Sequence, residues 1–118
     1  FISGDVSFFY DSNALWNKYI PSSFRVIVIN NGGGGIFKIL PGPQKTNVLD
    51  YFETQHHCSA EHLCKMYHLE YEKVTNKQKL FNKLETFFSD SNGPKLLEIF
   101  TPNNLNDKIL KEYFERIQ

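Results

Sequence analysis

The sequence predicts a single α/β domain with a mostly parallel sheet, and three observations support this fold class. The chain has 118 residues, a usual length for one domain, and contains neither an internal repeat nor a linker. Residues 24–29 and 95–100 are apolar almost throughout, which is typical of strands buried on both faces, as in parallel sheets. Such segments alternate with segments whose apolar residues have helical spacing, and this order indicates strand–helix–strand units.

The N-terminal half is expected to contain two strand ends and one helix. Residues 1–3 run directly into a turn signal, so we expect a strand that is cut short and a domain truncated at its N-terminal side. A helix is predicted to begin at Asp11 and to be closed by residues 21–23. The second strand is expected over 24–29, and it ends at two asparagines and four glycines, residues 30–35.

The C-terminal half is expected to continue this alternation after a short apolar piece and a Pro-Gly-Pro turn at residues 41–43. The expected elements are a helix capped by Ser59 and ending near Met66, a strand over 69–74, a helix over 77–88, a strand over 95–100 and an amphipathic helix with Leu105, Ile109, Leu110, Tyr113, Phe114 and Ile117 on one face. We therefore expect a Rossmann-like three-layer domain. In such domains ligands bind outside the carboxyl ends of the strands.

Composition and charge exclude several classes of protein. Aromatic residues make up 15% of the chain and hydrophobic residues 41%, which is too much for a disordered segment. Thirteen basic and thirteen acidic residues give a net charge of zero, so we expect neither a nucleic-acid partner nor attraction to an anionic membrane. The longest aliphatic stretch, residues 26–29, is far shorter than the roughly 18 residues of a membrane span. We expect no membrane insertion and a cytoplasmic location in which Cys58 and Cys64 stay reduced.

Oxygen-bearing residues follow the first two strands. Asp5 comes after the first strand, and Asn30, Asn31 and the glycine run 32–35 come after the second. Mg²⁺ takes about six oxygen ligands, and usually only one or two of them are carboxylates. One Asp, one Asn amide and one backbone carbonyl meet this demand if a phosphorylated ligand completes the shell, and glycines permit its close approach. Each loop taken alone is also an ordinary turn sequence. The glycines form neither a dinucleotide fingerprint nor a P-loop.

The two loops resemble the thiamin diphosphate motif, in which Gly-Asp-Gly is followed after a spacer by Asn-Asn, although Val6 stands where the motif has its second glycine. Three segments are more specific: GDVSFFYDSNAL from Gly4, VINNGGGGIFKILP from Val28 and EHLCKMYHLEYEKV from Glu61. Together they closely resemble the 2-succinyl-5-enolpyruvyl-6-hydroxy-3-cyclohexene-1-carboxylate synthases of menaquinone biosynthesis, one branch of the thiamin diphosphate enzymes. The resemblance runs from Gly4 nearly to the end of the chain.

The resemblance implies that residues 1–118 are the C-terminal part of a thiamin diphosphate-binding domain. The implied ligands of Mg²⁺ or Mn²⁺ are Asp5, the Asn31 side chain and the Gly33 carbonyl. Backbone around Gly4, Val6 and Ser7 is expected to hold the diphosphate, and Ile36, Phe37 and Leu40 are expected to line the substrate pocket.

The resemblance also implies an activity for the whole enzyme, a transferase. It would decarboxylate 2-oxoglutarate on thiamin diphosphate and add the succinyl-semialdehyde unit to isochorismate, as a homo-oligomeric dimer or tetramer. The glutamate that activates the cofactor belongs to another domain, usually of the partner subunit. No catalytic residue is therefore expected in this chain, which should be inactive alone.

Two other functions remain open at this point. The first is zinc binding, because cysteines and histidines are zinc ligands and six of them fall close together, although their spacing is poor. These residues are His56, His57, Cys58, His62, Cys64 and His68. The second is a non-catalytic α/β module that binds a nucleotide or a protein partner, which the fold alone would support.

Overall fold

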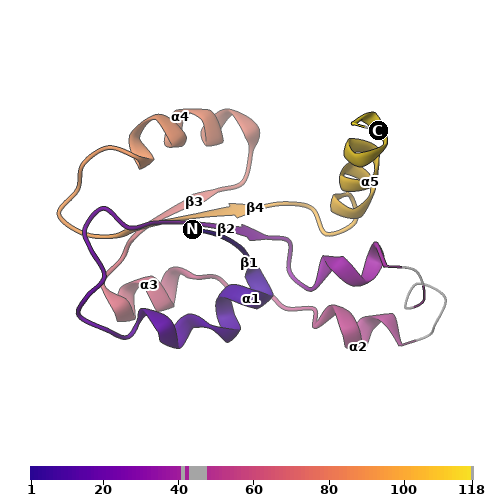
Figure 1. Cartoon of the computed structure of the whole chain (residues 1–118), viewed down its shortest axis with the longest axis horizontal. Coiled ribbons are helices and arrows are strands. Elements are labelled where there is room, and N and C mark those ends of the chain that lie inside the picture. Colours follow the sequence, from indigo (N-terminus) through magenta and orange to yellow (C-terminus); the bar gives the residue numbers. More distant parts are fainter. Residues whose placement is uncertain (41, 43–47, 118) are drawn as a thin grey trace.

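The computed structural model describes residues 1–40, 42 and 48–117, and its strands in this part form one parallel sheet. The strands are β1 (Ile2–Gly4), β2 (Arg25–Asn30), β3 (Glu70–Val74) and β4 (Lys95–Phe100). Their order in the four-stranded sheet is β1-β2-β4-β3, and all three neighbouring pairs are parallel (Figure 1). The predicted α/β class with a parallel sheet is confirmed.

Helices lie on both faces of the sheet and beyond its carboxyl edge. The helices are α1 (Asp5–Tyr10), α2 (Leu49–Glu53), α3 (Glu61–Tyr67), α4 (Lys77–Phe87) and α5 (Asn106–Arg116), with short 3₁₀ turns η1 (Ser12–Leu15) and η2 (Gly35–Lys38). Figure 1 shows α1 and α3 below the sheet, α4 above it, and α2 and α5 beyond the ends of β2 and β4. This is the expected three-layer arrangement. None of the helices in the described part combines the length and the apolar character needed to cross a membrane.

Two hydrophobic clusters, one on each face, explain why the central strands are apolar on both sides. Val26 and Val28 of β2 pack with Phe8 of α1 and Cys64 of α3 on one face. On the other face Leu97 of β4 packs with residues of α4 and β3. Complete burial of one such side chain contributes about 1.5 to 3 kcal/mol, so each cluster stabilises the packing of helices on its face of the sheet.

The first helix differs from the prediction. It begins at Asp5 directly after β1, whereas the sequence predicted a helix from Asp11; residues from Ser12 form only the 3₁₀ turn η1. The reason is local, because the Asp5 carboxylate accepts a hydrogen bond from the Val6 N–H and so stabilises a helix start immediately after the strand. The short helix α2 was not predicted. The turn expected at 41–43 lies outside the described residues except for Gly42.

The remaining predicted elements are present with small shifts at their ends. The strand predicted over 95–100 has these bounds as β4, and the helix predicted over 77–88 is α4, which ends one residue earlier. Ser59 lies one residue before the observed cap position, and its hydroxyl accepts a hydrogen bond from the Glu61 N–H at 3.2 Å. The C-terminal helix α5 is amphipathic as predicted, but its apolar side chains are exposed in this structure.

Candidate functional site

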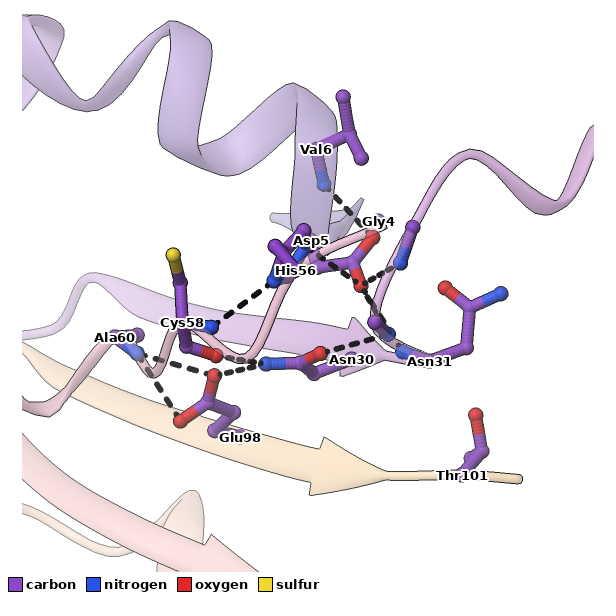
Figure 2. Close-up of polar contacts among 12 residues, drawn as sticks. Gly4, Asp5, Val6, Asn30, Asn31, His56, Cys58, Ala60, Glu98 and Thr101 are labelled. Atoms are coloured by element: carbon purple, nitrogen blue, oxygen red, sulfur yellow. Dashed lines mark hydrogen bonds and ion pairs between the residues drawn. The ribbon is translucent and has the colours of Figure 1, made fainter. Parts of the chain in front are cut away.

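The loops after β1 and β2 meet at the carboxyl edge of the sheet. Gly4 is paired with Ile29 in the parallel register, so Asp5 leaves the sheet beside Asn30, and Asn31 follows one residue later. The carboxylate of Asp5 is buried, with 2% of the residue exposed, and its Oδ2 atom lies 3.1 Å from the Asn31 backbone nitrogen (Figure 2). The structure therefore brings these two sequence-predicted residues together.

The backbone of the second loop surrounds the Asp5 carboxylate. Its Oδ2 accepts hydrogen bonds from the N–H groups of Asn31, Gly32 and Gly33 at 3.1, 2.7 and 3.1 Å. Gly32 has a φ of 76°, a left-handed conformation that favours glycine and that lets consecutive N–H groups point to one oxygen. These contacts supply the hydrogen bonds that a buried carboxylate needs.

The side-chain amide of Asn31 lies beside the Asp5 carboxylate and the Gly33 carbonyl. One polar atom of the Asn31 amide is 2.8 Å from the Gly33 carbonyl oxygen and 3.2 Å from Asp5 Oδ2. The amide nitrogen suits this position in the absence of a cation, because it can donate to both oxygens. With the amide oxygen there instead, its distances to the other two oxygens match the roughly 3 Å between adjacent ligands of a Mg²⁺ octahedron. The Asn31 amide therefore lies within 3.2 Å of both the Gly33 carbonyl oxygen and Asp5 Oδ2.

His56 approaches the same carboxylate from the segment after α2. Its Nε2 atom is 3.3 Å from Asp5 Oδ2, and its ring packs edge-on against Phe9 with a centroid distance of 5.3 Å. The Cys58 N–H donates to His56 Nδ1 at 3.1 Å, so Nε2 is the ring nitrogen beside Asp5. Sequence analysis did not predict this contact.

The zinc alternative has no support in the structure. Among residues 1–40, 42 and 48–117, no group of three or more His, Cys, Asp or Glu side chains is arranged to hold a metal ion. Of the six candidate residues, His56 faces Asp5, Cys58 is exposed and Cys64 is buried in the core.

The glycine run fits closely against the segment that leads from α2 to His56. The Gly34 N–H donates to the Glu53 carbonyl at 2.5 Å, and the His56 N–H donates to the Gly32 carbonyl at 3.0 Å. A Cβ atom on Gly33 would lie only 2.7 Å from the Glu53 carbonyl oxygen, so a side chain at this position requires the backbone to move. The buried Glu53 carboxylate forms an ion pair with Lys38 of η2 at 3.2 Å. This ion pair connects the segment after the glycine run to α2 through side chains.

A cavity of about 430 Å³ opens beside these oxygens. The predicted site residues that line it are Gly4, Asp5, Val6, Ser7, Asn31, Gly33 and Ile36. Its remaining wall includes Asn106, Asp107 and Leu110 of α5, which lie more than a hundred residues after Gly4 and carry no local sequence signal for such a role.

Two predicted pocket residues lie elsewhere. Phe37 packs against Phe52 with a ring-centroid distance of 5.3 Å, and Leu40 is 44% exposed; neither lines the cavity that contains Asp5. Their contact with a substrate stays a prediction. A larger cavity of about 680 Å³ is lined by residues of β1, α1 and η1 and shares only Ser7 with the predicted site.

A buried carboxylate in the middle of the sheet is connected to the site. Glu98 of β4 is 0% exposed and accepts a hydrogen bond from Asn30 Nδ2 at 2.7 Å on Oε1 (Figure 2). Its Oε2 accepts from Ser59 Oγ at 2.8 Å and from the Tyr71 hydroxyl at 2.6 Å, and the Ala60 N–H contacts both oxygens. Sequence analysis missed this group, although one acidic residue within the apolar strand KLLEIF is a signal of a buried polar contact.

Glu98 affects its neighbours electrostatically. The pKa of the Tyr71 hydroxyl is raised, first because of burial and then because the hydroxyl donates to Glu98. Burial, together with the negative charge of Glu98, also raises the pKa of Cys64 to about 12. Both neighbours therefore stay protonated at neutral pH, and Tyr71 can remain a donor to the carboxylate.

Comparison with known proteins gives a consistent set of relatives. No family model matches the chain. The 2-succinyl-5-enolpyruvyl-6-hydroxy-3-cyclohexene-1-carboxylate synthase of Christiangramia forsetii is 54% identical over 114 residues, which is 96% of this chain and 20% of that protein. The synthases of the same name from Flavobacterium johnsoniae and Flavobacterium psychrophilum are 55% and 48% identical over 99% and 98% of the chain, and 21% of each relative is covered. The chain spans about a fifth of the length of these relatives.

Proposed function

Because the chain is homologous over nearly its whole length to one part of the 2-succinyl-5-enolpyruvyl-6-hydroxy-3-cyclohexene-1-carboxylate synthases, we propose that it is the cofactor-anchoring part of such an enzyme. In this proposal residues 1–118 form the C-terminal portion of the thiamin diphosphate-binding domain. The cavity beside Asp5 holds the diphosphate end of the cofactor together with Mg²⁺ or Mn²⁺.

The arrangement of the three oxygens carries the proposal. Asp5 supplies a charged ligand, and the Asn31 amide and the Gly33 carbonyl supply neutral ones, a donor set that suits Mg²⁺ when phosphate oxygens complete its shell. The chain has no net charge, so the metal ion would provide the positive charge that a diphosphate needs. The chemistry of this donor set supports the proposal.

The other predicted residues have passive roles in this proposal. Backbone at Gly4, Val6 and Ser7 lines the cavity and would receive diphosphate oxygens, and Ile36 would present an apolar surface to the bound substrate. When bound, thiamin diphosphate supplies the electron sink for decarboxylation of a 2-oxo acid. This chain anchors and orients it, and holds the metal ligands in place.

The reaction of the whole enzyme is part of the proposal. We propose 2-oxoglutarate and isochorismate as its substrates, in menaquinone biosynthesis, and a homo-oligomeric dimer or tetramer as its assembly. The activating glutamate would lie in another domain. The cofactor site would be complete only when that domain is present.

Calorimetry on the full-length enzyme that contains this chain tests the proposal. Thiamin diphosphate should bind in the presence of Mg²⁺, and Asp5→Ala should weaken this binding at least about tenfold, because losing a charge-assisted contact costs about 1.5 to 3 kcal/mol. Asp90→Ala is the matched control, since Asp90 is an exposed aspartate that precedes β4 at the opposite edge of the sheet.

Two outcomes would contradict the proposal. One is binding of thiamin diphosphate with the same affinity whether or not Mg²⁺ is added. The other is an unchanged affinity in Asp5→Ala, which would make Asp5 only a residue that stabilises the loop. Binding of a nucleotide in place of thiamin diphosphate would favour the non-catalytic module instead.

A further inference from the structure

Asn30 is the link between the buried Glu98 carboxylate and the loop around Asp5. Its Nδ2 group donates to Glu98 Oε1 at 2.7 Å and to the Cys58 carbonyl at 3.0 Å. Because both acceptors are on this side, the amide oxygen must face the other way, where it accepts from the Gly32 N–H at 3.0 Å. The same Gly32 N–H donates to Asp5 Oδ2 at 2.7 Å. Glu98 and the Cys58 carbonyl therefore together determine which end of the Asn30 amide meets the loop.

A second connection runs through the segment before α3. Glu98 accepts hydrogen bonds from Ser59 Oγ and from the Ala60 N–H, and so fixes the backbone that follows Cys58. The Cys58 N–H in turn donates to His56 Nδ1, and His56 Nε2 lies 3.3 Å from Asp5 Oδ2. Both routes end on the same carboxylate oxygen, Asp5 Oδ2.

Both oxygens of Glu98 act as acceptors in this arrangement. Every partner of its two oxygens is a donor: an amide, two hydroxyl groups and a backbone N–H. The carboxylate accepts all of them, whereas a glutamine has a single acceptor oxygen, and with its NH₂ group at the Oε1 position it would meet Nδ2 of Asn30. Such a conflict is relieved if the Asn30 amide rotates, and its NH₂ group would then face the Gly32 N–H.

We propose that Glu98 is a positioning residue for the cofactor site, because it orients Asn30 and thereby holds the N–H groups and ligand oxygens of residues 31–33 around Asp5. The identity of the ligand rests on the proposed function, but the effect on the loop does not. Glu98 itself touches neither the cavity nor the predicted metal ligands.

The first test measures the loop without any ligand. Amide hydrogen exchange of the full-length enzyme is followed in a peptide that covers residues 30–34, in the wild type, in Glu98→Gln and in Tyr71→Phe. The control removes a hydroxyl that donates to Oε2 at 2.6 Å and leaves the Asn30 contact in place. We expect faster exchange of this peptide in Glu98→Gln and wild-type exchange in Tyr71→Phe, because only the first change releases Asn30.

The second test measures the site. Mg²⁺ is titrated into the same proteins at a fixed concentration of thiamin diphosphate, and binding is followed by calorimetry. The affinity for Mg²⁺ should fall at least about fivefold in Glu98→Gln and by less than about twofold in Tyr71→Phe, in the range of coupling between contacting residues. Asn30→Ala should lower the affinity for Mg²⁺ by a similar factor. In the double variant, Glu98→Gln should lower this affinity by less than about a further twofold, because Glu98 acts through Asn30.

Each result bears on one claim. Unchanged exchange and unchanged Mg²⁺ affinity in Glu98→Gln overturn the positioning role. Equal effects in Glu98→Gln and Tyr71→Phe also overturn it. So do additive effects of Glu98→Gln and Asn30→Ala in the double variant. If Glu98→Gln does not fold, Asn30→Ala decides, and wild-type exchange in that variant overturns the proposal. A wild-type enzyme that shows no Mg²⁺-dependent binding contradicts the proposed function instead, and the exchange measurement then still decides the role of Glu98.

Discussion

Asp5 carries most of the polar contacts that join the two strand ends. Four backbone N–H groups donate to its carboxylate: Val6 to Oδ1, and Asn31, Gly32 and Gly33 to Oδ2. Burying an ionised carboxylate is costly unless such donors surround it. Asp5 therefore has a structural role in addition to its proposed role as a metal ligand. Replacing Asp5 would remove both the loop contacts and the ligand.

The meeting of the two loops could be predicted from the sequence because its signal is local. Asp5 and the loop of residues 30–35 directly follow strands, and parallel strands bring such positions to one edge. The choice of Asn31 and Gly33 within that loop came from the family resemblance and stays a prediction. His56 and Asn106 have no such signal, since their places depend on how distant segments pack. Glu98 could have been noticed as an acidic residue in an apolar strand, but its partners could not.

The two cysteines give a prediction at the scale of residues. Iodoacetamide at pH 8 should alkylate Cys58, which is exposed, and leave Cys64 unmodified until the protein is unfolded. Cys64 is 1% exposed and its pKa is raised to about 12 by burial and by Glu98, so almost no thiolate, the reactive form, is present at this pH. Mass spectrometry of the labelled peptides measures both rates. Equal labelling of the two thiols in the folded protein would contradict the burial and the raised pKa of Cys64.

The glycine run and the segment of residues 52–56 form one unit that packs at the carboxyl edge. Backbone hydrogen bonds connect them at Gly32 and Gly34, and the ion pair between Lys38 and Glu53 connects them through side chains. The sequence predicted the glycine loop but not the helix α2, because five residues give too little periodicity for a prediction. The prediction of a helix start at Asp11 was also wrong, because the contact between the Val6 N–H and the Asp5 carboxylate stabilises a helix that begins at Asp5.

Replacement of one glycine tests this packing. Gly33→Ala should lower the melting temperature of the enzyme by several degrees, because the new Cβ would lie 2.7 Å from the Glu53 carbonyl oxygen and overpacking costs about 1 to 3 kcal/mol. Gly93→Ala is the control, as its Cβ would have its nearest neighbour at 3.9 Å. Thermal unfolding followed by circular dichroism measures both variants. Equal melting temperatures would mean that the loop does not pack against residues 52–56.

The whole molecule explains why the site lies where it does. In a parallel sheet with the order β1-β2-β4-β3, the ends of β1 and β2 are neighbours, and the C-terminal helix α5 covers the cavity that they open. The alternation of strands and helices was enough to predict this architecture. The position of α5 over the cavity was not predictable, because no local pattern specifies which surface a terminal helix covers.

The chain alone should be catalytically inactive. We expect no decarboxylation of 2-oxoglutarate by the 118-residue protein even with saturating thiamin diphosphate and Mg²⁺, because the proposed activating glutamate belongs to another domain. Carbon dioxide release is the measurement, with the full-length enzyme as the positive control. Turnover above background that persists after repurification would refute the division of roles between this chain and the rest of the enzyme.

The position of the metal ion is the most direct test of the account. Crystals of the full-length enzyme grown with thiamin diphosphate and Mn²⁺, a substitute for Mg²⁺ with a measurable anomalous signal, should give an anomalous peak at the carboxyl edge of the sheet. We predict that this peak lies within bonding distance of the Asp5 carboxylate, the Asn31 amide oxygen and the Gly33 carbonyl oxygen. A cofactor bound with its metal ion elsewhere, or an anomalous peak that contacts none of these three residues, would contradict the proposed site.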